Sequence, residues 1–93
     1  MKIVWTRRAI RDLTRERNFI ARENPTAAAD VALRIVGAVD TLSRQPQIGR
    51  VGRIAGTREF VVGGTPYILI YRAYERHVQL LHVYNSRRDW PPS

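Results

Sequence analysis

Residues 24–46 read NPTAAADVALRIVGAVDTLSRQP, and this stretch decides the fold. Asn24 can cap a helix with its side-chain oxygen, and Pro25 suits the first helical position, where no amide hydrogen is needed. Apolar residues then recur every three or four positions, which predicts an amphipathic helix that ends at Gln45-Pro46. The apolar stripe consists of Ala28, Val31, Ala32, Ile35, Val39 and Leu42.

The preceding residues predict a strand and another helix. Lys2 to Trp5 is strand-like, and Thr6 offers an N-cap for a helix over Thr6 to Arg22. The face of this helix expected to be buried carries Ala9, Ile10, Leu13, Arg17 and Ile20. The face expected to be polar carries Arg7, Arg8, Arg11, Asp12, Arg15 and Glu16. The two helices adjoin at Glu23-Asn24 and predict an antiparallel helical hairpin.

After residue 46 the periodicity drops to two. A Gly/Arg loop over residues 47–56 precedes three predicted strands, which are Thr57 to Val62, Pro66 to Arg72 and His77 to Tyr84. The predicted fold class is therefore α+β, in the order β-α-α-β-β-β. We expect one domain over residues 1–93, with the helical hairpin packed on one face of a small antiparallel sheet.

The strand over Tyr67 to Tyr71 is apolar at every position, so both of its faces should be buried. A chain of 93 residues has little material for a second covering layer. We therefore expect a partner segment to cover the face of the sheet that the hairpin leaves open.

Charge and composition restrict the class of protein. The net charge is +8, and all but one of the sixteen basic residues, Lys2, are arginine. This excess implies a polyanionic target, an acidic partner protein, or both. The chain has no cysteine, so disulfides and thiolate zinc sites are excluded. No signal peptide or membrane span is evident, and we expect a cytoplasmic protein without metal or cofactor.

Several segments together resemble the RelE/ParE superfamily of toxins from type II toxin–antitoxin systems. The segments run over nearly the whole chain: Trp5-Thr6-x-x-Ala9-x-x-Asp12-Leu13, Asn24-Pro25-x-Ala27-Ala28, Leu42-x-x-x-Pro46-x-x-Gly49-Arg50, Thr57 to Val62, and Pro66 to Arg72. No single segment is specific, but their order and spacing are. The resemblance implies a growth-inhibiting toxin that a cognate antitoxin neutralises, with operator DNA bound only through the antitoxin complex.

The resemblance leaves the target open. RelE-like members cleave mRNA on the ribosome without a metal, whereas ParE-like members inhibit DNA gyrase by binding it. A third alternative is a decayed module that binds its antitoxin and has lost toxicity. The enzyme class is correspondingly open, with a metal-free mRNA endoribonuclease as the candidate.

Metal-free RNA cleavage needs a base, an acid and cations that stabilise the phosphorane. The candidate catalytic residues are Arg58, Arg72, His82 and Tyr84. Strict alternation would place His82 and Tyr84 on one strand face together with Val78 and Leu80. Three of the four candidates also have a structural alternative: His82 as a core histidine, Tyr84 as a packing residue, and Arg58 as an ion-pair partner of Glu59.

The candidate nucleic-acid contacts are Arg50, Arg53, Arg87 and Arg88. The loop over Gly49 to Arg53 combines backbone freedom with two cations, although an ordinary solvated connection has the same composition. Residues 1–43 carry eight basic and five acidic side chains, and residues 44–93 carry eight and three. The positive excess therefore concentrates in the second half, which favours RNA as the target.

Two positions favour gyrase instead. Ile68 stands where RelE-like nucleases often carry arginine, and Asn85 stands where many carry histidine. Asparagine cannot exchange a proton near neutral pH. Because of the net charge, we predict ribosome-dependent mRNA cleavage as the function, with gyrase inhibition as the alternative.

Overall fold

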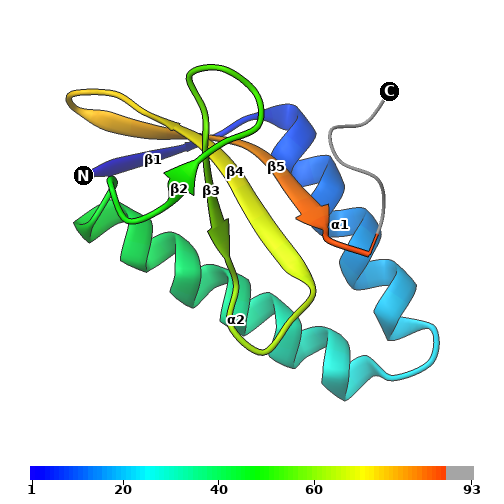
Figure 1. The fold of residues 1–93 in the computed structure, drawn as a ribbon. Coiled ribbons are helices and arrows are strands. Elements are labelled where there is room, and N and C mark those ends of the chain that lie inside the picture. Colours follow the sequence, from blue (N-terminus) through cyan, green and yellow to red (C-terminus); the bar gives the residue numbers. More distant parts are fainter. Residues whose placement is uncertain (88–93) are drawn as a thin grey trace.

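The computed structural model describes residues 1–87 of the chain. Its elements are β1 (Lys2–Trp5), α1 (Arg7–Ala21), α2 (Pro25–Arg44), β2 (Arg50–Val51), β3 (Arg58–Val61), β4 (Tyr67–Ala73) and β5 (His77–Asn85) (Figure 1). The predicted α+β fold and element order are confirmed. The two-residue strand β2 is an addition, because it lies in the segment that the sequence predicts as a loop.

Both helices begin at the predicted caps. The Thr6 hydroxyl accepts a hydrogen bond from the amide of Ala9 at 3.1 Å. The Asn24 side chain does the same for the amide of Ala27 at 3.0 Å, and Pro25 follows as the first helical residue. Each cap satisfies one of the amides that a helix start leaves without an intrahelical partner.

The five strands form one sheet in the order β1-β5-β4-β3-β2. Neighbouring strands from β2 to β5 are antiparallel, as short connections require. β1 pairs with β5 in parallel, with Ile3 opposite Val78 and Trp5 opposite Leu80. No tight turn joins these two strands, so their relative direction is not constrained, and the sheet is mixed.

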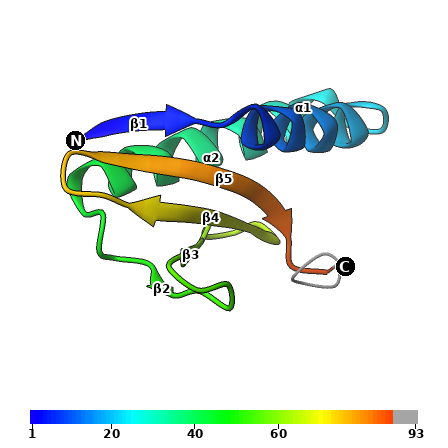
Figure 2. The ribbon, with the colours of Figure 1, turned by 90° about the horizontal axis from the view of Figure 1, so that it is seen from above.

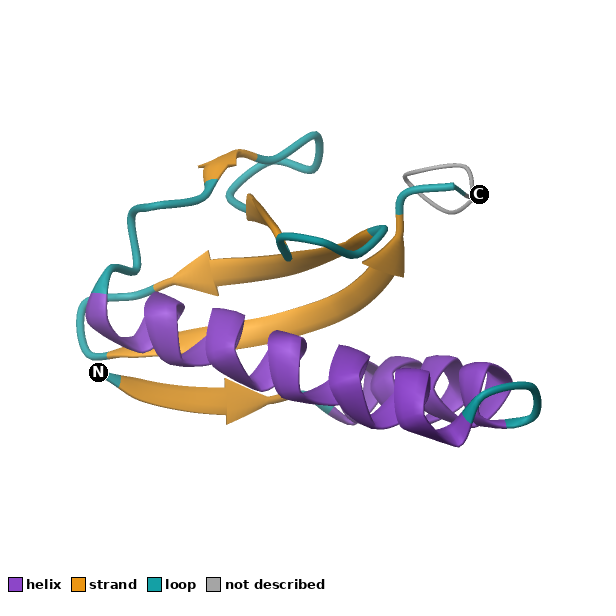
Figure 3. Cartoon of the chain, turned by 90° about the horizontal axis from the view of Figure 1, so that it is seen from below, coloured by secondary structure: helices purple, strands orange, loops and turns teal. Residues whose placement is uncertain are grey.

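The hairpin covers one face of the sheet, as predicted (Figures 2 and 3). Figure 3 shows the hairpin along one side of the molecule and β2 with its loops on the opposite side. The core joins the helices to the central strands through Ile35, Val39 and Leu42 of α2, Tyr67, Leu69 and Tyr71 of β4, and Val78, Leu80 and Val83 of β5. Within residues 1–87, neither helix is long and apolar enough to cross a lipid bilayer.

The predicted faces of α1 need correction. Ile10 is 52% exposed, whereas Asp12 and Glu16, both expected on the polar face, are buried. The reason lies in β5, which continues after β1 has ended and therefore lacks a strand partner on that side. Asp12 supplies the missing acceptor, because its carboxylate accepts a hydrogen bond from the amide of Val83 at 3.2 Å.

A bulge in β5 corrects the predicted placement of His82 and Tyr84. His82 lies opposite Ile70 and Leu80 lies opposite Tyr71, so Leu81 is an extra residue in the ladder. One inserted residue reverses the alternation of side chains beyond it. Val78 and Leu80 therefore face the helices, whereas His82 and Tyr84 lie on the opposite face.

On that opposite face, Ile68 is 7% exposed and Ile70 is fully buried. Ile70 has Glu59 and His82 as its cross-strand neighbours. The two isoleucines are thus buried within the chain itself, so their burial does not require a partner segment, and coverage of this face by a partner stays a prediction.

Candidate functional site

The structure divides the four candidate catalytic residues between the two faces of the sheet. Arg58 lies opposite Tyr71 in the β3–β4 ladder and therefore shares the helix-side face with it. On the other face His82 pairs with Ile70 and Tyr84 pairs with Ile68, and Arg72 shares this face because it follows Ile70 by two residues on β4. Three of the four are therefore on one face, and Arg58 is not.

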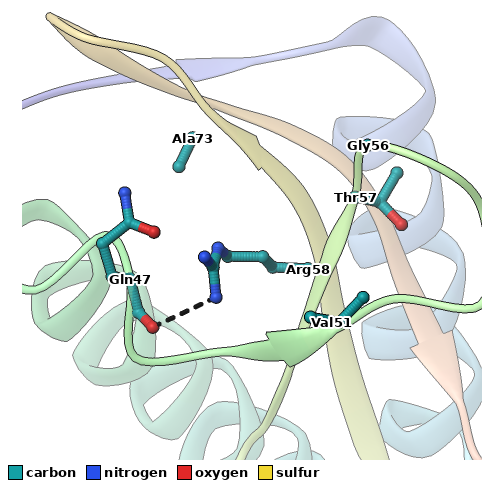
Figure 4. Close-up of a pocket in the computed structure, with 6 residues that line it drawn as sticks. All are labelled: Gln47, Val51, Gly56, Thr57, Arg58 and Ala73. Carbon is teal, nitrogen blue, oxygen red and sulfur yellow. Dashed lines mark hydrogen bonds between the residues drawn. The ribbon is translucent and has the colours of Figure 1, made fainter.

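Arg58 lies under the loop that follows α2. Its Nη1 donates to the carbonyl of Gly49 at 2.8 Å. It also donates to the carbonyl of Gln47 at 3.3 Å (Figure 4). The expected alternative, an ion pair with Glu59, does not form. Adjacent residues of a strand point to opposite faces, so the two side chains diverge.

Arg58 is one of the residues that line a pocket of about 270 Å³. We call it the Arg58 pocket, and its walls are Gln47, Val51, Gly56, Thr57, Arg58 and Ala73 (Figure 4). The volume lies just under the roughly 300–1,000 Å³ typical of small-molecule sites. It is sufficient for one side chain or one small anion.

Tyr71 fixes the loop that forms one wall of the pocket. Its hydroxyl donates to the carbonyl of Pro46 and accepts from the amide of Gly49, both at 2.9 Å. Burial raises the pKa of this hydroxyl, while the Gly49 hydrogen bond and the charge of Arg58 act in the opposite direction. A Cβ on Gly49 would lie 2.5 Å from the Tyr71 hydroxyl, so only glycine fits there.

The Gly/Arg loop is held closed by Glu59. Its buried carboxylate accepts from the Arg50 side chain at 3.0 Å and from the backbone amide of Arg53 at 2.9 Å. Arg72 reaches the same loop from β4 and donates to the carbonyl of Ala55 at 3.3 Å. The loop is therefore a hydrogen-bonded element and not a flexible connection, a closure that the sequence does not reveal.

Asp12 lies at the centre of a charged cluster between α1 and β5. Besides the amide of Val83, its carboxylate contacts Arg8 Nε at 3.1 Å and Arg15 Nη2 at 3.3 Å. The Nδ1 of His82 lies 3.4 Å from the second oxygen of Asp12. The cluster joins the hairpin to the last strand, and sequence periodicity missed it because it assigned Asp12 to solvent.

The residues after β5 add little to the candidate site. The Asn85 side chain accepts from the amide of Arg87 at 2.9 Å, so it stabilises the turn that ends β5. The side chain of Arg87 is exposed, and Arg88 lies outside the described residues. Residues 1–87 contain no group of three histidine or acidic side chains placed to hold a metal ion.

Comparison with known proteins identifies the family. Residues 3–90 match the family model of the ParE toxin of the type II toxin-antitoxin system, parDE. Y4kP, a candidate toxin of Sinorhizobium fredii, is 44% identical over 97% of this chain and 93% of its own length. The toxin RelE2 of Caulobacter vibrioides is 37% identical over 94% and 97%. The chain therefore belongs to the ParE toxin family.

The fold has a close counterpart among solved structures. A chain of the chromosomal ParDE toxin–antitoxin system of P. aeruginosa superposes with a TM-score of 0.82 at 24% identity, over 91% of this chain and 95% of the other. The protein is thus the toxin of a type II toxin–antitoxin system, and a cognate antitoxin is its partner. The resemblance stated from sequence is confirmed.

Proposed function

We propose that this toxin inhibits DNA gyrase by binding it and does not cut RNA. The observation that carries the proposal is the position of Arg58, which lies on the opposite face of the sheet from Arg72, His82 and Tyr84. An RNA phosphate held by those three residues would be separated from Arg58 by the sheet. The set of four candidate catalytic residues is therefore not assembled around one point.

The remaining groups are also occupied by structural contacts. Nη1 of Arg72 donates to the carbonyl of Ala55, and Nδ1 of His82 lies beside Asp12. Ile68 is buried, and Asn85 holds a turn, so neither supplies the cation or the acid that nuclease relatives carry there. Stabilisation of a phosphorane needs donors directed at one position, because misplaced donors lose most of their effect.

A binding mode makes use of the charge without requiring catalysis. The net charge of +8 favours association with an acidic protein surface and accelerates the encounter. Gyrase is a cytoplasmic enzyme, so the proposal also implies a cytoplasmic toxin, with operator DNA reached only through the antitoxin complex.

The test uses toxin that has been separated from its antitoxin and refolded. Added to purified gyrase and relaxed plasmid, it should abolish supercoiling in proportion to its concentration. Added to translating ribosomes, it should leave the message intact at the A-site codon. Unchanged supercoiling together with a cut message would contradict the proposal. If neither assay responds and induction causes no growth arrest, the chain is the decayed module.

Ribosome-dependent mRNA cleavage is the second candidate, because Arg72, His82 and Tyr84 do share a face. It predicts that Tyr84→Phe and His82→Asn each remove toxicity while the antitoxin still binds. Gyrase inhibition through another surface predicts that both variants remain toxic. Induction of each variant without antitoxin, followed by measurement of protein and DNA synthesis, separates the two candidates.

A further inference from the structure

The Arg58 pocket contains a cation that no carboxylate within residues 1–87 neutralises. Other arginines of the chain have acidic partners, such as Asp30 for Arg34, Asp40 for Arg44 and Glu59 for Arg50. Arg58 has only the carbonyls of Gln47 and Gly49. A carbonyl orients a guanidinium without cancelling its charge.

The orientation leaves donors available. Both hydrogen bonds of Arg58 come from Nη1, and within residues 1–87 its Nε and Nη2 have no acceptor. These two nitrogens carry the parallel N–H groups that bind a carboxylate in a two-point arrangement. Because two carbonyls and the β3 backbone hold the side chain in place, little entropy remains to be lost when a ligand binds.

The walls of the pocket favour one carboxylate over a phosphate chain. Val51, which is 82% exposed, and Ala73 are apolar and can contact the methylene groups of an acidic side chain. Among the six lining residues Arg58 is the single cation, whereas nucleic-acid sites follow a backbone of phosphates with several. A volume of about 270 Å³ is large enough to admit one such side chain.

We propose that the Arg58 pocket receives an aspartate or glutamate side chain of the cognate antitoxin. The antitoxin is the protein partner that the family assigns to this chain, and the net charge of +8 favours an acidic one. The contact is a charged hydrogen-bonded pair shielded by Val51 and Ala73. The inference does not depend on gyrase as the target.

The first test compares the affinity of two toxin variants for the co-encoded antitoxin by calorimetry. Arg58→Gln should weaken binding by about 30-fold or more, because truncation of one partner in a shielded charge pair costs several kcal/mol. Arg44→Gln is the matched control, with the same loss of charge at an exposed pair with Asp40, and should change binding by about twofold at most. Equal affinity of the two variants would overturn the proposal.

The second test identifies the acidic residue. Each aspartate and glutamate of the antitoxin is changed to its amide and measured against the wild-type toxin and Arg58→Gln. One of these changes should weaken binding to the wild-type toxin but hardly alter binding to the Arg58→Gln variant. The two effects on the affinity should differ by about tenfold or more. If every antitoxin change alters the affinity by the same factor for the wild-type toxin and for the Arg58→Gln variant, no carboxylate of the antitoxin occupies the pocket.

Arg58 also holds Gln47 and Gly49, so Arg58→Gln can loosen the loop. A measurement on the wild-type toxin avoids this problem. In toxin labelled with ¹⁵N-arginine, the Nε–H resonance of Arg58 should shift on addition of antitoxin, while that of Arg44 stays in place.

An unchanged Arg58 resonance in the complex overturns the proposal. So does an Arg58→Gln variant that binds antitoxin normally but no longer inhibits gyrase. Failure of gyrase inhibition by the wild-type toxin would contradict only the proposed function.

Discussion

The arginines of the helical hairpin and those at the β2–β3 end of the sheet are held by different acceptors. On the hairpin, Arg34 and Arg44 each pair with an aspartate four residues earlier in the same helix. At the β2–β3 end, Arg58 and Arg72 donate to backbone carbonyls of neighbouring loops. The hairpin thus balances much of its charge locally. At the sheet end Arg50 is paired with Glu59, whereas Arg58 and Arg72 keep their charge and hold loops in place.

This difference suggests where the chain can recognise a charged partner. A helix-surface pair is exposed, screened by salt and worth little. A guanidinium held by carbonyls is both oriented and uncompensated, which is the condition for binding a carboxylate. The two arginines at this end differ in the same way, because Arg50 is paired with Glu59, whereas Arg58 lies on the helix side without a carboxylate partner among residues 1–87.

The largest expected effect concerns Asp12, a hairpin acid whose contacts extend beyond its own helix to β5. Asp12→Ala removes the acceptor for the Val83 amide and the partner of Arg8 and Arg15. A buried amide without an acceptor and the loss of charged hydrogen bonds should lower the free energy of unfolding by about 3 kcal/mol. Urea denaturation measures the loss.

Asp40→Ala is the matched control for that experiment. Asp40 is 62% exposed and contacts only Arg44 by an ion pair, so its loss should change the free energy of unfolding by about 0.5 kcal/mol or less. Similar losses for the two variants would show that Asp12 does not join the hairpin to β5.

The sequence predicts those parts of the structure that a residue and its near neighbours along the chain determine by themselves. The caps Thr6 and Asn24 and the stripe through Ile35 and Leu42 depend only on local spacing, and the hairpin follows from them. Asp12 was assigned to the wrong face because its acceptor role depends on where β1 ends beside β5. No periodicity within α1 contains that information.

The candidate site was less predictable for the same reason. The bulge at Leu81 moved His82 and Tyr84 to the other face, and a single extra residue leaves no mark in an alternating pattern. In the sequence Tyr71 is only the last apolar position of a strand, yet its hydroxyl holds a loop more than twenty residues away along the chain. Contacts between distant segments determine the site, whereas contacts within segments determine the elements.

At the sheet end, Glu59 is the one acid that neutralises an arginine there among the described residues, and Glu59→Gln tests its role. The amide keeps the shape of the side chain but loses the charge that Arg50 and the Arg53 amide bind. Charged hydrogen bonds contribute about 1.5–3 kcal/mol, so we expect a loss of about 2 kcal/mol by urea denaturation. Glu75→Gln, at an exposed turn, should lie within about 0.5 kcal/mol of wild type. Equal effects would contradict the closure of the loop by Glu59.

A smaller effect is expected from Tyr71→Phe, which leaves the carbonyl of Pro46 and the amide of Gly49 without their partner. The expected loss at pH 7 is about 1.5 kcal/mol. Burial raises the pKa of Tyr71 in the folded state, so the hydroxyl stabilises the fold below its unfolded pKa, and this contribution is lost as the pH rises through the folded pKa. The stability difference between wild type and Tyr71→Phe should therefore narrow above about pH 10. A constant difference from pH 8 to 11 would exclude this linkage.

The smallest effect should come from the exposed pair of Asp30 and Arg34, whose side chains are 62% and 49% exposed. Asp30→Asn should lower the free energy of unfolding by about 0.3–0.5 kcal/mol at low salt, as is usual for such pairs on a helix surface. The difference should vanish near 1 M salt, where the screening length is about 3 Å. The Glu59→Gln loss should persist under the same conditions because that carboxylate is buried. If salt removed both losses equally, the buried carboxylate of Glu59 would be screened as fully as the exposed pair on the hairpin, and this difference between the two regions would disappear.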